Sequence, residues 1–338
     1  MANPAVIQGI QSGNLRPGIL QRIWLKRQGS DATSLLSVAP ITTVPTLSGY
    51  YHYWDENGVI NSGGAADPLV AKSLDQPAQP GGLKLTSAAY SVLNYAWGHQ
   101  TIVDETVQEF AARGEDVLAA YTEKLAAQGV QHHAKTVGTV LNTSGSYSES
   151  AISGPGLATT PSGDLIGAVN TALLGFIANG VSIMQPDDDF VAVINTTTYA
   201  TIVKAYQIKE YGAIAAISGP STFATGFNDR GAVERFFKNA FMRPLRLVVS
   251  DHTTQTQAGT VSNVITDGYM SIFKVARGQG DSGFLSTFTT DSSGVTGRVI
   301  SYRQNNPEGI GIYVKGLYGV TVLGGSSKFA RLITGLTA

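Results

Sequence analysis

Two adjacent histidines, His132 and His133, have side chains that could bind a metal ion or move a proton. Histidines that bind one metal from a helix usually stand four residues apart, because this spacing puts both rings on the same face. Adjacent rings point in different directions in most backbones. We therefore interpret this pair as histidines of the surface or of a loop, and metal binding is the less favoured alternative.

Three consecutive aspartates, Asp187, Asp188 and Asp189, offer the carboxylate oxygens that hard cations such as Ca²⁺ prefer. They follow Pro186 and stand directly before the apolar residues 190–194, which have the length and composition of a buried strand. A solvated acidic turn at the start of a strand explains the same pattern. We favour the turn, and a metal site is the alternative.

The string Gly280-Asp281-Ser282-Gly283 resembles the surroundings of a serine-protease nucleophile. A nucleophilic serine needs a histidine and an aspartate oriented against it, and a glycine-rich hairpin loop explains the string more simply. The chain also has no phosphate-binding loop of the Walker type and no GxGxxG between a strand and a helix. We therefore predict that the protein is not an enzyme and holds no cofactor or metal.

The composition is poor in charge. Of 338 residues, 14% are charged and 43% are hydrophobic, whereas roughly 25% are charged in an average domain. Depletion of charge is typical of the buried centres of protein interfaces. We therefore expect other copies or partners to cover much of the surface; the alternative is a soluble protein that uses Ser, Thr, Asn and Gln in place of charge. The net charge of −1 excludes polyanion binding by the chain as a whole.

The chain has no cysteine, which excludes disulfides, thiolate metal sites and cysteine nucleophiles. Its first residues lack the basic start and apolar centre of a secretion signal, and no apolar run reaches membrane-spanning length. We expect a protein that is made in a reducing cytoplasm and has no membrane partner.

Residues 50–54 read YYHYW, five ring-bearing side chains in a row. Successive residues of a strand point to opposite faces, so a strand here would show rings on both faces, whereas a surface strand normally has one polar face. We predict a strand over 46–54, its partner over 83–97, and a long loop rich in Gly, Pro and Ser between them. This hairpin has little of its own sequence to pack against.

The rest of the chain combines amphipathic helices with short apolar strands. Apolar residues at three- and four-residue spacing predict a helix over about 102–128, with Gly129 as its stop and the polar residues 130–163 as a loop. Helices over 165–179, 195–206 and 229–241 follow, and the predicted strands are 190–194, 245–249, 264–265, 270–275, 299–302, 310–315 and 318–323. Helices beside mostly antiparallel strands indicate an α+β fold.

The order of these elements resembles the major capsid protein of tailed bacteriophages, the Hong Kong ninety-seven type of capsid fold. The segments that carry the resemblance are SVLNYAWGHQTIVDE, DLIGAVNTALLGFIANG, FVAVINTTTYATI and IGIYVKGLYGVTVLGG. The resemblance covers nearly the whole chain. It implies an N-terminal arm over 1–45, an extended loop hairpin over 46–97, a peripheral domain with the spine helix over 98–156, an axial domain over 157–275, and C-terminal strands that return to the peripheral domain over 276–338.

The resemblance implies a structural function without catalysis. Copies would associate into pentamers and hexamers and close an icosahedral head around double-stranded DNA, as part of a virion that assembles in the host cytoplasm. The expected partners are other copies, a portal protein, a decoration or cement protein and, because a short arm precedes the extended loop, a separate scaffolding protein. Two alternatives stay open: an encapsulin-like compartment shell with a protein cargo, and a secreted carbohydrate-binding or adhesive protein.

The resemblance also implies where subunits touch. The extended loop of this fold lies over a neighbouring subunit, so the rings of the hairpin are expected at that contact. They are Tyr50, Tyr51, Tyr53, Trp54, Tyr90, Tyr95 and Trp97. Residues 1–30 carry basic side chains and no acidic one, and we expect them to contact packaged DNA or acidic patches of neighbouring subunits. The basic residues are Arg16, Arg22, Lys26 and Arg27.

Overall fold

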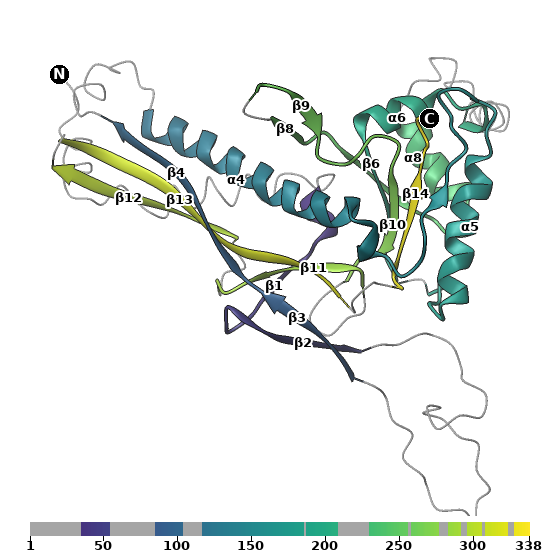
Figure 1. Cartoon of the computed structure of the whole chain (residues 1–338), viewed down its shortest axis with the longest axis horizontal. Helices are drawn as coiled ribbons and strands as arrows, with labels where there is room; N and C mark the ends of the chain where they lie inside the picture. Colours follow the sequence, from purple (N-terminus) through teal and green to yellow (C-terminus); the bar gives the residue numbers. More distant parts are fainter. Residues whose placement is uncertain are drawn as a thin grey trace, which may run out of the picture.

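The computed structural model describes residues 35–54, 85–103, 117–185, 187–208, 230–255, 258–276, 283–291, 296–305, 308–323 and 328–338. They form an elongated molecule with two lobes (Figure 1). In the compact lobe, helices surround a sheet; in the extended lobe, one long helix lies along long strands. Within these ranges, no helix combines the length and the apolar character needed to span a membrane.

The extended lobe is built on a five-stranded sheet whose central strand is β13 (Glu308–Val322). One part of β13 pairs antiparallel with both β12 (Gly297–Asn305) and β4 (Leu93–Val103). Its last residues pair antiparallel with β11 (Leu285–Thr289), and β1 (Ile41–Thr43) adds a parallel edge beside β11. Segments from the beginning, the middle and the end of the sequence therefore meet in one sheet.

The long helix is α4 (Val117–Asn142), so the prediction of a helix over 102–128 is wrong in position. Residues 102 and 103 belong to β4, and the helix continues 13 residues beyond Gly129. The reason is a buried stripe at four-residue spacing, formed by Leu125, Gly129, His133, Val137 and Leu141. Gly129 is a buried position inside the helix, and it does not end the helix.

The compact lobe holds the second five-stranded sheet, in the order β5 (Ile152–Ser153), β14 (Ala330–Thr334), β10 (Met270–Lys274), β6 (Phe190–Asn195) and β7 (Arg246–Ser250). The outer pairs β5–β14 and β6–β7 are parallel, and the inner pairs are antiparallel. The predicted division assigned the whole C-terminal region to the peripheral domain. The structure differs there, because the buried strand β14 pairs with β10 in this sheet.

The strand β6 is buried on both faces. Its alternate residues Phe190, Ala192 and Ile194 pack in one apolar cluster with the helices of the compact lobe. The residues between them, Val191 and Val193, pack in a second cluster that includes the buried side of α4. The period of two along a strand therefore makes β6 the layer that joins the two lobes.

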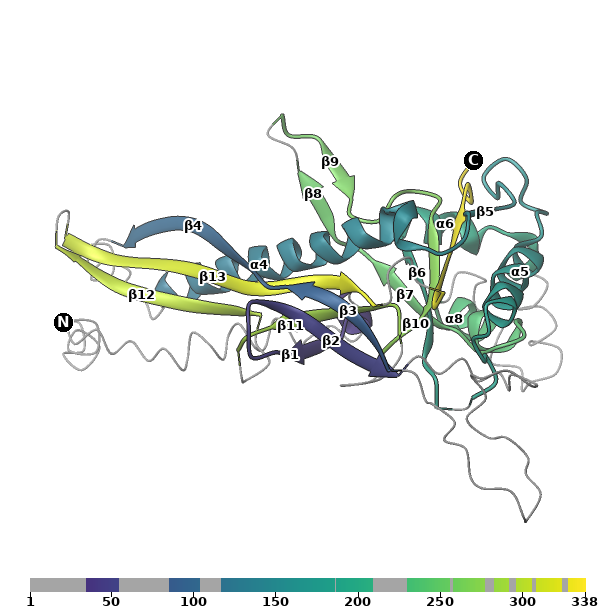
Figure 2. The same cartoon turned by 60° about the horizontal axis from the view of Figure 1, so that its bottom comes forward.

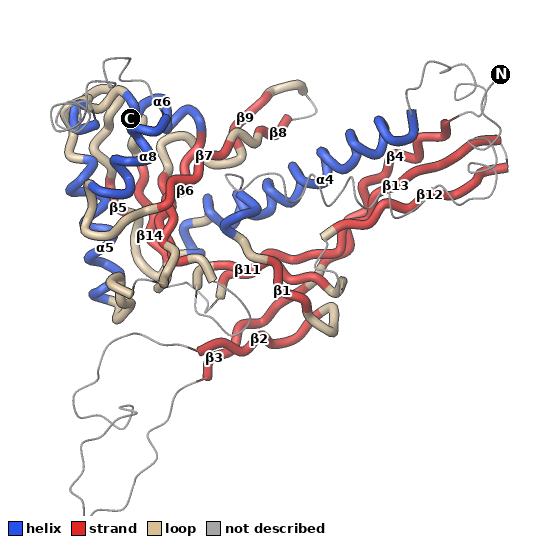
Figure 3. The backbone as a smooth tube through the Cα atoms, turned by 180° about the vertical axis from the view of Figure 1, so that it is seen from behind, coloured by secondary structure: helices blue, strands red, loops and turns tan. Residues whose placement is uncertain are grey.

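Three helices cover the outer face of this sheet, as Figure 3 shows from behind: α5 (Leu165–Ala178), α6 (Thr196–Val203) and α8 (Arg230–Asn239). Two of them begin at side-chain caps. The Asp164 carboxylate accepts a hydrogen bond from Gly167 N, and the Asn195 side chain accepts one from Thr198 N. All three helices and β6 lie where the sequence predicts them, within a few residues.

Two hairpins project from the lobes (Figure 2). The first pairs β2 (Ser48–Trp54) with β3 (Leu85–Ser91), and the second pairs β8 (Thr253–Gln255) with β9 (Val261–Asn263). The predicted partner strand over 83–97 is in fact two strands, because the chain leaves the hairpin after Ser91 and continues as β4 against β13.

Candidate assembly surfaces

The two faces of the β2–β3 hairpin have different surroundings. On one face, Tyr51 and Tyr90 are 6% and 7% exposed and lie over Phe288 of β11, with ring centroids 5.2 and 5.0 Å away. The Tyr90 hydroxyl is hydrogen-bonded to the Thr46 hydroxyl at 2.8 Å. The position opposite Tyr90 has to be glycine, because a Cβ on Gly49 would lie 2.9 Å from the Tyr90 hydroxyl. These rings hold the hairpin to its own subunit.

The opposite face of the hairpin is open. Tyr50 is 71% exposed, and its cross-strand neighbour Ala89 is also exposed. Leu47 and Leu93 lie at the base of the same hairpin, where Val92 N donates to Leu47 O at 2.7 Å, and both leucine side chains are at least half exposed. We call Leu47, Tyr50 and Leu93 the hairpin surface. These three apolar side chains of the hairpin and its base face water in this subunit.

The predicted intersubunit rings are therefore divided. Tyr51 and Tyr90 are used in the core of their own subunit, and Tyr50 stays available for a neighbour. The side chains of Tyr53, Trp54 and Trp97 lie outside the described part of the structure, as do the basic residues Arg16, Arg22, Lys26 and Arg27. Sequence reasoning missed Leu47 and Leu93, because isolated leucines near predicted strand ends carry no signal of exposure.

Tyr95 does not belong to the hairpin. It lies on β4, where its ring contacts His132 of α4 and Tyr318 of β13, with centroids 4.7 and 5.0 Å apart. His132 Nδ1 lies 2.7 Å from the Tyr318 hydroxyl. Burial raises the pKa of both tyrosines, so both hydroxyls stay protonated near neutral pH. These rings pack between α4 and the sheet and fill the contact between them.

The prediction that the adjacent histidines are surface or loop residues is wrong. His133 is fully buried in α4, its Nε2 is 3.1 Å from the Thr287 hydroxyl, and its ring lies 4.4 Å from that of Tyr318. Its Nδ1 has no hydrogen-bond partner among the described residues. Burial, together with the nearby charge of His132, lowers the pKa of His133 to about 3. The ring is therefore a neutral core side chain near neutral pH.

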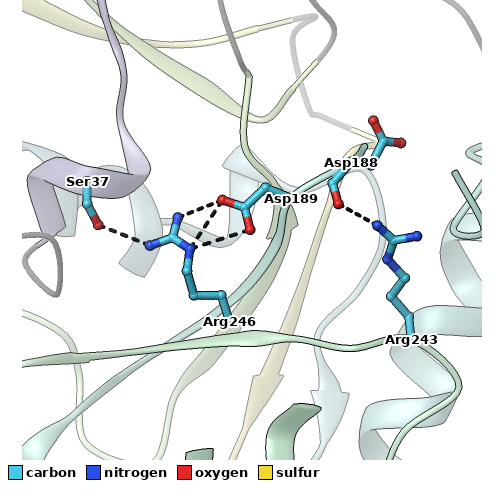
Figure 4. A network of polar contacts seen from close by, with 5 residues as sticks. All are labelled: Ser37, Asp188, Asp189, Arg243 and Arg246. Atoms are coloured by element: carbon cyan, nitrogen blue, oxygen red, sulfur yellow. Dashed lines mark hydrogen bonds and ion pairs between the residues drawn. The ribbon is translucent and has the colours of Figure 1, made fainter. Parts of the chain in front are cut away.

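Two of the three aspartates before β6 are paired, which corrects the predicted solvated turn for Asp188 and Asp189, whereas Asp187 is exposed as expected. Asp188 makes an ion pair of 2.9 Å with Lys274, and both side chains are largely buried. Asp189 makes an ion pair of 2.8 Å with Arg246, whose guanidinium also donates to the Ser37 hydroxyl at 3.3 Å (Figure 4). The turn thus ties the segment before β1 to the compact lobe. No group of three or more metal-binding side chains occurs among the residues described.

A second arginine fixes the loop that leads into this turn. The buried guanidinium of Arg243 donates to the carbonyl oxygens of Ile183 at 2.7 Å and Gln185 at 2.6 Å, and also to that of Asp188. It lies over the ring of Phe190, 5.3 Å from the centroid. Hydrogen bonds from a charged donor are stronger than neutral ones, so Arg243 anchors the described residues on both sides of this turn to the compact lobe.

The motif that resembles a protease nucleophile stays untested, since Gly280, Asp281 and Ser282 lie outside the described residues. Most buried charged groups of the described part are held in ion pairs or hydrogen bonds, and three buried side-chain atoms, His133 Nδ1, His252 Nε2 and the Tyr302 hydroxyl, have no hydrogen-bond partner among the described residues. The features that remain are open apolar surfaces, and these are suited to contacts with other protein surfaces.

No protein-family model matches the chain, and no curated protein matches it. The fold has clear solved neighbours. A phage-related protein from Bordetella bronchiseptica superposes with a TM-score of 0.62 at 13% identity, over 94% of this chain and 97% of that one. The capsid of the cyanophage P-SCSP1u gives 0.52 at 16% identity, over 88% and 86%. The mature capsid of bacteriophage PhiM1 gives 0.52 at 10% identity, over 89% and 86%.

The chain therefore has the fold of phage capsid proteins. The prediction of a mixed α+β capsid fold, made from the order of the elements, is confirmed. Identities of this size establish the fold and not the function.

Proposed function

We propose that this protein is the shell-forming major capsid protein of a tailed phage, whose copies assemble into the pentamers and hexamers of an icosahedral head around double-stranded DNA. The observation that carries the proposal is the fold shared with solved phage capsids, over 88% of this chain and 86% of the cyanophage capsid chain and over 89% and 86% for PhiM1. The low charged fraction of 14% supports it, because a surface that other copies cover needs fewer charges.

The hairpin surface is the proposed contact of the β2–β3 hairpin with a neighbouring subunit. A two-stranded hairpin alone is marginally stable in water, and here one of its faces is held by Phe288 of its own subunit. The other face presents Tyr50, and Leu47 and Leu93 are exposed at the base of the hairpin. Exposed apolar side chains on a projecting element suit a contact in which one subunit overlaps the next.

Further partners belong to the same proposal. A scaffolding protein, a portal protein, a decoration protein and packaged DNA are expected for a tailed-phage head, which would make the chain a virion component. The basic residues of the N-terminal arm, from Arg16 to Arg27, are proposed to contact DNA or neighbouring subunits. A steep loss of DNA retention with rising salt would support phosphate contacts over protein contacts.

The test is assembly of the full chain, expressed alone and together with a candidate scaffolding protein. Light scattering should give masses far above the 35.5 kDa of the monomer, and negative-stain images should show rings or closed shells. Replacing Leu47, Tyr50 and Leu93 with serine should lower shell yield at least tenfold and leave the circular dichroism of the subunit unchanged. The matched control replaces two exposed threonines with serine: Thr139 in α4 and Thr143 directly after its end.

The contents of the particle separate the alternatives. DNA-filled or empty heads agree with the proposal, and shells that hold one protein cargo and no DNA favour the encapsulin-like compartment. A monodisperse monomer at high concentration, with scaffold supplied, would contradict the shell function. Specific binding of such a monomer to glycans would support the carbohydrate-binding alternative.

A further inference from the structure

The helix α5 leaves an apolar stripe open to solvent. Its sequence from Leu165 to Ala178 contains no charged residue. Leu173 and Phe176 are buried against the sheet, whereas Leu174 and Ile177 on the outer side are about half exposed. The stripe carries no charged residue, and no other element of the described chain covers it fully.

Two methionines extend this stripe. Asn170 precedes Leu174 by one helical turn, and its side chain accepts a hydrogen bond from Met242 N at 3.1 Å, which places Met242 beside the stripe. Arg243 follows Met242 and donates to the carbonyls on both sides of Met184. We call Leu174, Ile177, Met184 and Met242 the α5 surface; their exposures lie between 42% and 65%.

The α5 surface is held rigidly from behind. The buried guanidinium of Arg331, on β14, donates to Gly175 O and lies against the ring of Phe176, 5.6 Å from its centroid. A Cβ at position 175 would lie 2.5 Å from Arg331 Nε, so any larger residue there would displace this guanidinium. On the flank, Arg243 fixes the loop that carries Met184. A rigid surface loses little conformational entropy when it is covered.

The chemistry of the α5 surface excludes several occupants. The helix carries no basic side chain for phosphates of nucleic acid or lipid, and no acidic one for a basic peptide. The α5 surface consists of four partly exposed side chains. A stable two-protein complex needs about 800 Å² from each partner, which is the surface of roughly 20–30 residues. A surface of four side chains therefore suits a contact that is one of several between the same subunits and is repeated within one assembly.

We propose that the α5 surface is an intersubunit contact that a second copy of this chain covers, an inference that rests on the proposed shell function. The α5 surface and the hairpin surface consist of different residues on different lobes. Contacts between unlike surfaces of identical subunits are heterologous, and they close into rings when the rotation between subunits permits it. The proposal takes the α5 contact to be of this heterologous kind, with a different region of the neighbouring copy as the partner of the α5 surface.

The experiment introduces charge on this stripe of the full-length chain. The double variant Leu174→Asp with Ile177→Asp should reduce shell or capsomer yield at least tenfold in light scattering, with the circular dichroism and thermal midpoint of the unassembled subunit kept near wild type. The matched control is Gln128→Asp with Gln131→Asp, which has the same three-residue spacing on the exposed face of α4. This control should assemble within twofold of wild type.

A second measurement keeps the test decisive if the double variant folds poorly. The chain has no cysteine, so Ile177→Cys gives a single thiol. A maleimide should label this thiol at least tenfold more slowly in assembled particles than in dissociated subunits. Equal labelling rates, or normal assembly of the folded double-aspartate variant, would overturn this proposal alone. A wild-type chain that stays monomeric with scaffold supplied would overturn the shell function as well.

Discussion

The helices α4 and α5 are both buried along one side, yet their outer sides differ. The outer side of α4 carries exposed charged and amide side chains, Glu123, Lys124, Gln128, Gln131 and Lys135 among them. The outer side of α5 carries Leu174 and Ile177 and has no charge. Both helices follow the same rule for their inner sides, which is burial of apolar residues at helical spacing.

The difference shows that the inner side of a helix reports on the fold of the subunit and the outer side on its surroundings. A helix whose outer side faces solvent carries polar residues there, as α4 does. In α5 the outer side is apolar, and no other element of the described chain covers it. The same contrast divides the β2–β3 hairpin, whose inner rings contact Phe288 and whose outer ring, Tyr50, is largely exposed.

The largest expected effect comes from the same substitution on the two helices. Val137→Asp places a carboxylate on the fully buried stripe of α4, and we expect the free energy of unfolding to fall by about 4 kcal/mol or more. Ile177→Asp on α5 should cost the unassembled subunit about 1 kcal/mol or less. Urea denaturation followed by circular dichroism measures both. Equal losses would mean that the outer side of α5 is part of the subunit core.

The hairpin gives the second comparison. Tyr90→Ala removes a ring that stacks on Phe288, and it should lower the free energy of unfolding by about 3 kcal/mol. Tyr50→Ala, one strand away on the open face, should change it by about 0.5 kcal/mol or less. Both variants are compared as dissociated subunits in urea. A similar loss for Tyr50 would show that its ring, too, is held by its own subunit.

The smallest effect is a difference in pH dependence. The pKa of His133 is lowered in the folded chain from 6.5 to about 3, so the unfolded chain binds the proton more readily. Stability from this group is therefore complete above about pH 6.5 and is lost as the pH falls toward 3, with a slope of at most about 1.4 kcal/mol per pH unit.

The variant His133→Gln removes this titration, and its free energy of unfolding should fall less steeply with acid than that of wild type. Other groups that titrate in the same range cancel in the difference between the two proteins. The helix α5 contains no titratable side chain, so Ile177→Ser should show the wild-type slope. A wild-type slope in His133→Gln would mean that His133 is accessible to protons in the folded state.

Much of the compact lobe could be predicted from the sequence, because its signals are local. The helix α5 begins at Asp164 and α6 at Asn195, and both are capping residues that stand directly before apolar periodic runs. The strand β6 is a continuous apolar run of typical strand length. The order of such elements was also sufficient to identify the capsid fold.

The position of α4 could not be predicted in this way, because Gly129 and His133 occupy core positions where the pattern expects apolar residues. The partners of the aromatic hairpin are also non-local: Tyr51 and Tyr90 are covered by Phe288, far away in the sequence. The acidic turn was misread for the same reason, since Arg246 and Lys274 reach it from other strands. The outer side of α5 was visible in the sequence, but whether Leu174 or Leu173 faces water depends on the packing.

The strand β13 has a mechanical consequence. Its 15 residues span roughly 50 Å, from the far end of the extended lobe to β11 beside α4 (Figure 2). Hydrogen bonds in an antiparallel ladder run perpendicular to the strands. A pull along β13 therefore loads the bonds to β11 in shear, and they have to yield together, whereas a sideways pull opens the bonds one pair at a time. The extended lobe should thus resist tension along its length better than peeling from its edge.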